Sequence, residues 1–461
     1  MTATAWLIVA IAAAAPQGDH VLIMPGALEG RPAARNTSPL QARIDAATAG
    51  SRLVVEAGDF RGDLVVDRPV TLVGRGRPRL IGSGAGSVIR VRAGNVTIEG
   101  FDIDGSAGGD LSRDSSGIHI AGEHVTVRDC RVVNSLFGIF LRAATSATVE
   151  RCSIRGIPGR DPGEKGSGIH VWNTERFSLI GNTIVDVRDG IYIQSSPMGR
   201  TIGNVARDVR YGLHYMSSDD NVFEDNLFEN GAAGTAIMYS RRLEFRRNRF
   251  IRNRGFASVG LLFQTCDDVV AEDNLVADNA RGIFLEGTHR CAFRRNVIAG
   301  SDTAIVLYDN AKDTIFEGNS FVGNMTPLLL VGRRTDTAFD GNYWSGNQEP
   351  DLDGDGRCDR PYRLSTAFDH FRGNLTAADL FADGFASAAL GVAEHAFPVL
   401  QAVQAVDRVP LARPPSLPAV PRPAGPQPAY DAIGMTGTAA LAFAGLAALW
   451  SGGRRRKVAG P

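Results

Sequence analysis

The stretch GIHVWNTERFSLIGNTIVDVRD, residues 168–189, is followed directly by GIYIQSSPMGRTIGNVARDVRY, residues 190–211. Both copies are 22 residues long and open on a glycine and an isoleucine, and both carry an asparagine 14 residues after the glycine, Asn182 and Asn204. Their apolar runs are short and alternating, and neither copy shows the 3.6-residue spacing of a helix. This period indicates a solenoid in which each copy forms one coil.

The same unit recurs over most of the chain. The residues at its first position are Gly117, Gly138, Gly168, Gly190, Gly212, Gly234, Gly260, Gly282 and Ala304. The successive spacings between them are 21, 30, 22, 22, 22, 26, 22 and 22 residues. A second column contains Cys130, Cys152, Asn182, Asn204, Asn226, Asn248, Asn274, Asn296, Asn319 and Asn342. Leucine-rich repeats have a similar length, but their Leu-x-x-Leu-x-Leu frame is absent. The sequence therefore predicts an all-β parallel β-helix of about eleven coils over residues 37–345.

The asparagine column predicts an internal turn ladder, because equivalent residues of stacked coils lie about 4.8 Å apart. The two longer spacings predict loops extruded at residues 156–166 and 252–256. A helical pattern at residues 39–49 predicts a cap over the N-terminal end of the solenoid. Residues 346–408 are expected to form a C-terminal cap that holds an Asp-rich loop and a helical segment at residues 375–406. Eight prolines within residues 409–430 predict an extended linker.

Both ends of the chain carry apolar segments typical of export across a membrane or insertion into one. Residues 1–15 end in an apolar run closed by alanines and predict a signal peptide, although this stretch contains no lysine or arginine. Residues 433–451 contain no charge and precede the basic cluster Arg454-Arg455-Arg456-Lys457, which predicts a membrane-spanning helix with a cytoplasmic C-terminus. A buried core helix, or a segment removed by processing, are the alternatives. We therefore expect the body of the protein outside the cytoplasmic membrane, with a membrane tether as an open question.

Composition excludes several classes of protein. The net charge of −1 gives no general electrostatic reason to bind nucleic acid. A hydrophobic fraction of 44% is too high for a disordered chain. The five scattered cysteines are an odd number without zinc-type spacing, which excludes a full disulfide framework. Cys130 and Cys152 are expected on adjacent coils, and whether they form a disulfide is open.

The alternation within each glycine-started strand predicts which side chains face outward. The third position holds His119, Phe140, His170, Tyr192, His214, Ala236, Leu262, Phe284 and Val306, and the fifth holds Ala121, Arg142, Trp172, Gln194, Met216, Met238, Gln264, Glu286 and Tyr308. A neutral imidazole with thioethers is a soft donor set that suits Cu(I). Taken alone, the pattern favours a hydrophobic face that docks a partner protein over direct copper ligation, and the two can coexist. The copper candidates are His214, Met216, Met238 and, more weakly supported, His170.

An acidic motif lies after the last repeat. Asp351, Asp353, Asp355 and Asp359 occupy loop positions 1, 3, 5 and 9 of an EF-hand-like calcium loop with glycine at position 6. Tyr362 stands at position 12, where a bidentate acid is expected, so an Asp/Gly-rich turn without metal is the alternative. The pairs Asp219-Asp220 and Asp267-Asp268 flank Arg241-Arg242 in the repeat register, which favours an ion-paired ridge over a catalytic pair of carboxylates.

The most specific segment is residues 211–287. It contains GLHYMSSDDN (212–221), AIMYSRR (236–242), NRGFA (253–257) and RGIFLEG (281–287), and DGNYW (340–344) follows. These stretches resemble the NosD family of periplasmic proteins, over residues 37–375. The resemblance implies a right-handed β-helix and a non-enzymatic role in maturation of the copper-sulfide centre of nitrous oxide reductase. It also implies an ABC transporter with membrane and ATPase subunits, a copper-chaperone lipoprotein and nitrous oxide reductase as partners.

Two other functions remain open. Parallel β-helices also carry extracytoplasmic polysaccharide lyases, epimerases and hydrolases, but the outward columns are too apolar for a sugar cleft. A docking scaffold that never touches metal is the third interpretation, and it differs from the first only in whether copper contacts this chain.

Overall fold

The computed structural model describes residues 38–109, 111, 114–255, 258–375, 378, 384–396 and 405–415. The predicted signal peptide and the predicted membrane helix at 433–451 lie outside these residues, as does most of the predicted linker. Among the described residues, none of the helices combines the length and the apolar character needed to span a bilayer.

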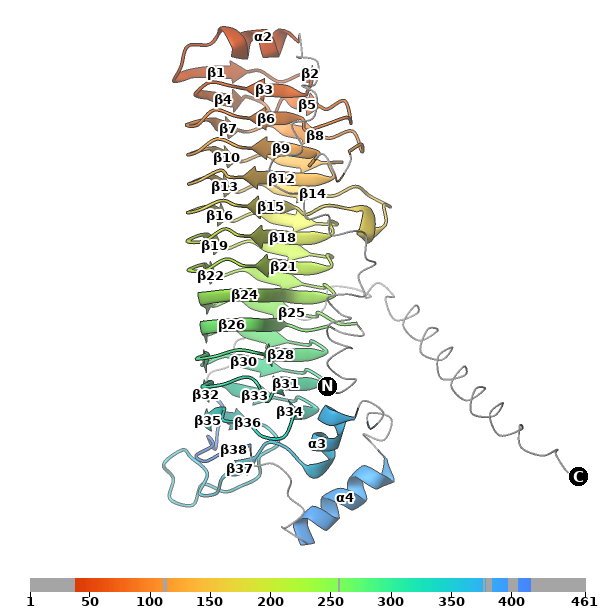
Figure 1. Ribbon diagram of the computed structural model, residues 1–461, viewed down its shortest axis with the longest axis vertical. Coiled ribbons are helices and arrows are strands. Elements are labelled where there is room, and N and C mark those ends of the chain that lie inside the picture. The colour runs from red at the N-terminus through yellow and green to blue at the C-terminus, as the bar shows by residue number, and fades with distance from the viewer. Residues whose placement is uncertain are drawn as a thin grey trace, which may run out of the picture.

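The described chain winds into a parallel β-helix in which each coil contributes three short strands, one to each of three faces (Figure 1). The third face forms a separate sheet of 13 strands, so the solenoid has thirteen coils. The estimate of about eleven coils was too low, because the first coils lack the glycine and asparagine signals of the later ones. The parallel β-helix itself is confirmed.

The first face carries the glycine-started strands, which pair in parallel register from coil to coil. Its strands are β3 (Leu64–Val66), β6 (Ile89–Val91), β9 (Ser116–Ile120), β12 (Phe137–Arg142), β15 (Ile169–Trp172), β18 (Asp189–Gln194), β21 (Tyr211–Met216), β24 (Ala233–Arg246), β26 (Leu261–Glu272), β28 (Arg281–Glu286), β31 (Thr303–Tyr308) and β34 (Thr326–Val331).

The second face joins the first in one sheet of 25 strands, because β24 and β26 run through both faces. Its own strands are β1 (Ser51–Val55), β4 (Val70–Gly74), β7 (Thr97–Glu99), β10 (Thr126–Arg128), β13 (Thr148–Glu150), β16 (Ser178–Ile180), β19 (Arg200–Ile202), β22 (Val222–Glu224), β29 (Ala292–Arg294), β32 (Ile315–Glu317) and β35 (Ala338–Asp340).

The third face closes each coil. Its strands are β2 (Asp59–Arg61), β5 (Arg79–Ile81), β8 (Asp102–Asp104), β11 (Arg131–Val133), β14 (Ser153–Arg155), β17 (Thr183–Val185), β20 (Val205–Arg207), β23 (Leu227–Glu229), β25 (Arg249–Ile251), β27 (Leu275–Ala277), β30 (Val297–Ala299), β33 (Ser320–Val322) and β36 (Tyr343–Trp344). A short 3₁₀ turn, η2 (Pro162–Glu164), lies in the predicted loop 156–166.

The repeated glycine is required where the first face meets the interior side chains of the third. A Cβ at Gly138 would lie 2.5 Å from Cγ2 of Ile154, and one at Gly190 would lie 2.6 Å from Cβ of Ala206. Both distances are shorter than real carbon–carbon contacts, so only glycine fits. Glycine therefore recurs at this position because the first and third faces approach each other closely there, and not because the backbone adopts an unusual angle.

The asparagine column forms the predicted ladder inside the solenoid. Asn226 shows the pattern, because its carboxamide oxygen accepts from the backbone N–H and the side-chain amide of Asn204, at 2.9 and 3.1 Å. Its own amide donates to Thr201 O and to Asn248 Oδ1 at 2.8 and 2.9 Å. Each rung thus satisfies polar groups that have no access to water, in a core otherwise built of aliphatic side chains and stacked phenylalanines.

A helix caps the N-terminal end as predicted. Helix α2 (Pro39–Ala46) begins after Ser38, whose hydroxyl accepts from the backbone N–H of Gln41, and has proline at its first position. The buried Gln41 side chain accepts from Val65 N at 2.8 Å and donates to Val65 O at 2.9 Å. The helix therefore satisfies part of the open edge of the first coil as well as covering its core.

The C-terminal cap differs in detail from the expectation of one helical segment at 375–406. Helix α3 (Ala367–Asn374) begins earlier and packs on β34, and α4 (Phe385–Ala396) follows it. Strand β38 (Val406–Asp407) then pairs with β35 and with β37 (Tyr362–Arg363). The backbone N–H of Leu411 donates to Asn342 O of the last coil, and that of Ala412 donates to Gly356 O of the cap, so the expected linker boundary at residue 409 lies too early. The chain up to Ala412 belongs to the cap.

Candidate functional site

The outer surface of the first face carries a ladder of rings, one from each of five consecutive coils. The centroids of His119 and Phe140 lie 5.3 Å apart, those of Phe140 and His170 4.3 Å, and those of His170 and Tyr192 4.4 Å, all with nearly parallel planes. Tyr192 then meets His214 edge-on at 4.8 Å. Aromatic residues therefore separate the three histidines, and the in-register stacking of the coils sets their spacing.

These outward columns are more covered than the expected open face. His119, Phe140 and Ala236 are buried, while His170 and His214 are partly buried. Beyond the histidines, the outer surface becomes a separate apolar cluster formed by Ala233, Val259, Phe284, Val306 and Tyr308. The face points away from the solenoid interior as predicted, but its side chains pack against one another instead of standing free in solvent.

Three of the four copper candidates lie together. His214 and Met216 project from the same side of β21, and Met216 is directly in register with Met238 on β24. All three side chains are partly buried. The donors are an imidazole nitrogen and two thioether sulfurs, a set that fits a soft, monovalent copper ion and suits calcium or magnesium poorly.

The fourth candidate, His170, does not join this group directly. It lies on β15, and the ring of Tyr192 on β18 stands between it and His214. The Tyr192 hydroxyl donates to Gln194 at 2.7 Å and lies 4.0 Å from the sulfur of Met216. Burial lowers the pKa of His170 to about 3, so the imidazole is neutral at physiological pH. Its buried Nδ1 atom has no hydrogen-bond partner among the described residues.

Sequence reasoning missed two charged residues of this site. The Asp189 carboxylate accepts from Arg210 at 2.8 and 2.7 Å and lies 3.2 Å from Nδ1 of His214. Strict alternation would place Asp189 inside the coil. However, Gly190 and Ile191 both face the interior, because the glycine interrupts the alternation, and this places Asp189 on the outer side. An acidic residue directly before the glycine of a repeat was the available signal.

The acidic loop brings three of its four predicted carboxylates together. Ligand atoms of Asp351, Asp353 and Asp355 all lie within 4.8 Å of one another. In the described part of the chain, no other group of three or more Asp, Glu, His or Cys side chains lies as close together. Asp359 instead accepts from the backbone N–H of Leu352 at 2.6 Å. The loop carboxylates also accept from backbone amides of their own turn. Calcium binding stays a prediction.

The other acidic pairs form a ridge of ion pairs at the turns. Arg242 donates to Asp220 at 2.6 and 2.9 Å and to Asp219 at 3.3 Å, while Arg241 lies 3.7 Å from Asp267. The arrangement repeats two coils later, where Arg290 pairs with Asp268. Each of these carboxylates has an arginine partner, which fits the ridge inferred from the sequence.

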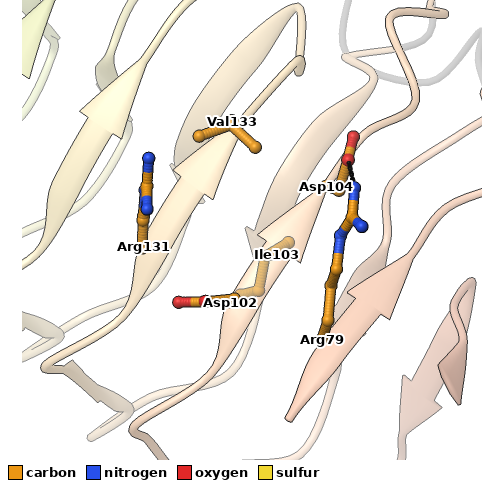
Figure 2. Close-up of a pocket in the computed structure, with 6 residues that line it drawn as sticks. All are labelled: Arg79, Asp102, Ile103, Asp104, Arg131 and Val133. Carbon is orange, nitrogen blue, oxygen red and sulfur yellow. Dashed lines mark hydrogen bonds and ion pairs between the residues drawn. The ribbon is translucent and has the colours of Figure 1, made fainter. Parts of the chain in front are cut away.

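Figure 2 shows the side chains that line a hollow on the third face, on β5, β8 and β11. Its volume is about 190 Å³, and it is lined by Arg79, Asp102, Ile103, Asp104, Arg131 and Val133. Arg79 pairs with Asp104 at 2.5 Å across it. Ligand sites generally have volumes of about 300–1,000 Å³. This small, charged hollow is therefore a poor candidate for a substrate site.

Comparison with known proteins adds sequence relationships to this geometry. Residues 153–350 match the family model described as "Periplasmic copper-binding protein (NosD)". The "Probable ABC transporter binding protein NosD" of Stutzerimonas stutzeri is 27% identical over 172 residues, which cover 37% of this chain and 38% of the relative. Its namesake from Pseudomonas aeruginosa is 28% identical over 146 residues, 31% of this chain and 34% of the relative. The matches thus span little more than a third of either relative.

Solved structures confirm the fold. The A-module of the mannuronan C-5 epimerase AlgE6 of Azotobacter vinelandii superposes with a TM-score of 0.57 at 16% identity, covering 66% of this chain and 93% of that one. A family 28 exopolygalacturonase of Yersinia enterocolitica gives a TM-score of 0.52 at 14% identity, covering 67% and 75%. At such low identity the likeness extends to the β-helix and not to the chemistry.

Proposed function

Because this chain is a NosD-like parallel β-helix, we propose that it is a periplasmic, non-enzymatic accessory protein that receives and passes on copper during maturation of nitrous oxide reductase. The observation that carries the proposal is the placement of His214, Met216 and Met238 on neighbouring strands of one face. These residues lie inside the segment that matches the copper-binding family model.

The donor set suits transfer better than storage. Two thioethers and one imidazole leave the coordination of a Cu(I) ion incomplete, so a ligand from a donor or acceptor protein can enter before the ion leaves. A closed cage of four strong ligands would hold the ion too tightly for such an associative exchange. The partly buried setting also keeps bulk water from competing for the ion.

Surroundings of the site favour docking of a protein that carries the copper. The partly exposed rings of Trp172 and Tyr192 lie on one side of the donors along the face, and the partly exposed Leu262 lies on the other. Aromatic and methionine side chains are adaptable contact residues. We propose that a copper-chaperone lipoprotein docks here, which places its ion beside Met216 and Met238.

Helix α4 carries a second candidate contact surface, at the C-terminal end of the solenoid. Its exposed side chains include Phe385, Ala389, Val392 and Ala396, which follow one another at helical spacing along one face. Phe385 is 90% exposed and Val392 is 72% exposed. The two NosD relatives are named as ABC transporter binding proteins. We propose that this apolar stripe contacts the membrane subunits of such a transporter, with residues 433–451 tethering the chain nearby.

Titration of the full-length protein with Cu(I) against a competing chromophoric chelator tests the function. The Met216→Ala/Met238→Ala variant should fold like the wild type, because neither side chain belongs to the core, yet its Cu(I) affinity should fall at least about tenfold. A matched control is Met198→Ala/Met325→Ala, which removes two exposed methionines elsewhere and should bind as the wild type does.

Other outcomes separate the rival functions. Equal uptake by wild type and the Met216/Met238 variant would place copper elsewhere on the chain. No uptake by either would leave a metal-free docking scaffold, which a pull-down with the chaperone would then test. Depolymerisation or epimerisation of alginate or polygalacturonate by the purified protein would instead support a polysaccharide enzyme and overturn the proposal.

A further inference from the structure

We propose that Asp189 and Arg210 position His214 for copper by fixing which of its two ring nitrogens is free. The inference rests on the function proposed above. It gives Asp189 and Arg210 the role of orienting one of the proposed copper ligands. Neither residue would contact the ion. Asp189 would act through His214, and Arg210 would act through Asp189.

The contacts form a short chain that starts at the arginine. Arg210 donates from Nε to Asp189 Oδ1 at 2.8 Å and from its terminal nitrogen to Oδ2 at 2.7 Å, so the carboxylate is held in a bidentate pair. The same Oδ2 atom lies 3.2 Å from Nδ1 of His214, which is the one ring nitrogen within reach of the carboxylate.

Burial makes this chain rigid. The side chain of Asp189 is only 4% exposed and that of His214 only 16%. The Arg210 guanidinium also lies over the ring of Tyr211, 4.3 Å from its centroid. The imidazole of His214 also contacts the rings of Tyr192 and Tyr211. Its centroid lies 4.8 Å from that of Tyr192 and 5.2 Å from that of Tyr211, and both tyrosine rings are nearly perpendicular to it. The His214 ring therefore has little freedom to turn away from the carboxylate.

A carboxylate can only accept a hydrogen bond, so Asp189 favours the tautomer of neutral His214 that carries its proton on Nδ1. The lone pair then sits on Nε2, the nitrogen available to a metal. Histidine ligands in metal sites commonly donate their other N–H to a carboxylate in this way, and loss of that partner typically lowers metal affinity by about 10–100-fold.

Arg210 adds a specific consequence for substitution. Both oxygens of Asp189 accept from the donor-only guanidinium, so an asparagine at position 189 offers one acceptor oxygen where Asp189 offers two. When its NH₂ group takes the place of Oδ2, it would donate to Nδ1 and move the imidazole proton to Nε2, where it blocks the ligand position. Replacement of one oxygen by NH₂ should therefore weaken the preference for the Nδ1 proton with little change in shape.

The experiment reads the tautomer directly, without copper. Full-length protein labelled with ¹⁵N-histidine is studied by two-bond ¹H–¹⁵N correlation at pH 8, and the His214 signals are identified by their loss in His214→Gln. The wild type should show a protonated Nδ1, and Asp189→Asn should show a larger share of protonated Nε2. Cu(I) affinity of Asp189→Asn, measured by chelator competition, should fall by about 10-fold or more.

Asp225→Asn is the matched control. Arg247 holds Asp225 in an equally bidentate pair at 2.9 and 3.0 Å, so the same atom is changed in the same kind of pair, on the exposed ridge. This variant should leave both the His214 tautomer and the Cu(I) affinity unchanged.

Two results would overturn the inference. One is a spectrum in which His214 of the wild type carries its proton on Nε2. This result does not depend on whether any variant folds. The other is a shift of the proton towards Nε2 in Asp189→Asn with unchanged Cu(I) affinity. Failure of the proposed function looks different, because the wild type would then bind no Cu(I) while the His214 spectrum still showed the Nδ1 proton held by Asp189.

Discussion

The carboxylate of Asp407 completes the asparagine ladder at Asn342, although 65 residues separate the two in the sequence. One oxygen of Asp407 accepts from the backbone N–H of Asn342 at 3.0 Å and from its side-chain amide at 2.9 Å, as the next asparagine does at each earlier rung from Asn182 onward. The same oxygen accepts from the indole N–H of Trp344 at 3.0 Å. The chain thus returns after α4 to close its own last coil.

Asp407→Ala should therefore destabilise the whole solenoid. The substitution leaves the N–H groups of Asn342 and Trp344 buried without an acceptor, and each such loss costs about 1–3 kcal/mol. We expect the free energy of unfolding, measured by urea titration, to fall by roughly 2–4 kcal/mol. Asp369→Ala, which removes the N3 carboxylate of the capping box at the start of α3, is the control and should cost about 1 kcal/mol. Equal effects of the two substitutions would contradict a terminal role for Asp407.

Gly138→Ala tests the close approach of two faces. An added methyl group would lie 2.4 Å from the carbonyl oxygen of Gly168 as well as 2.5 Å from Ile154, so the coil must shift to admit it. Overpacking of this kind costs about 1–3 kcal/mol, visible as a lower midpoint in thermal unfolding. Gly86→Ala is the control, because a Cβ there meets nothing within 4 Å. A neutral Gly138→Ala would mean that the glycine column has another cause.

Much of this fold could be predicted from the sequence, because a solenoid repeats its own contacts. Gly190 and Asn204 each recur at a fixed interval, and each has one physical role, close approach or an internal rung. Asp407 has no such signal, since it acts once and arrives from a segment outside the repeat. The first coils were undercounted for a similar reason, because their rungs lack asparagine.

The candidate site was predicted only in part, for a local reason. Outward placement of His214, Met216 and Met238 follows from alternation, which holds after the glycine of each repeat. Alternation between inward and outward side chains fails across the glycine itself, so it does not predict that Asp189 faces outward. Arg210, which pairs with Asp189, was missed for the same reason. Burial of the face depends on packing between coils, which one coil's sequence does not contain.

Cysteine chemistry gives a prediction about the start of the ladder. Cys130 and Cys152 are free, buried thiols at the first two rungs, and they donate to backbone carbonyl oxygens at 3.3 and 3.4 Å. Because all five cysteines are buried, a thiol reagent should react slowly with native protein purified without reductant. After unfolding in guanidinium it should count five thiols per chain. A count of three would reveal a disulfide that the structure does not contain.

Acid sensitivity should depend on His119. Burial, reinforced by the positive charges of Arg90 and Arg142, lowers the pKa of this imidazole to about 3 in the folded protein. An unfolded histidine has a pKa of about 6.5. Between these two values the unfolded chain binds a proton that the folded chain excludes, so stability is complete above about pH 6.5 and declines as the pH falls towards 3.

His119→Phe should remove this contribution while keeping a ring that stacks on Phe140. Between pH 7.5 and 4.5, the free energy of unfolding of the wild type should fall by on the order of 2 kcal/mol more than that of the variant. At pH 7.5 the variant should be at least as stable, because it also removes a buried Nδ1 atom that lacks a hydrogen-bond partner. His124→Asn, at an exposed turn, should keep the wild-type slope. Parallel curves for His119→Phe and the wild type would show that His119 does not stay neutral in the folded protein.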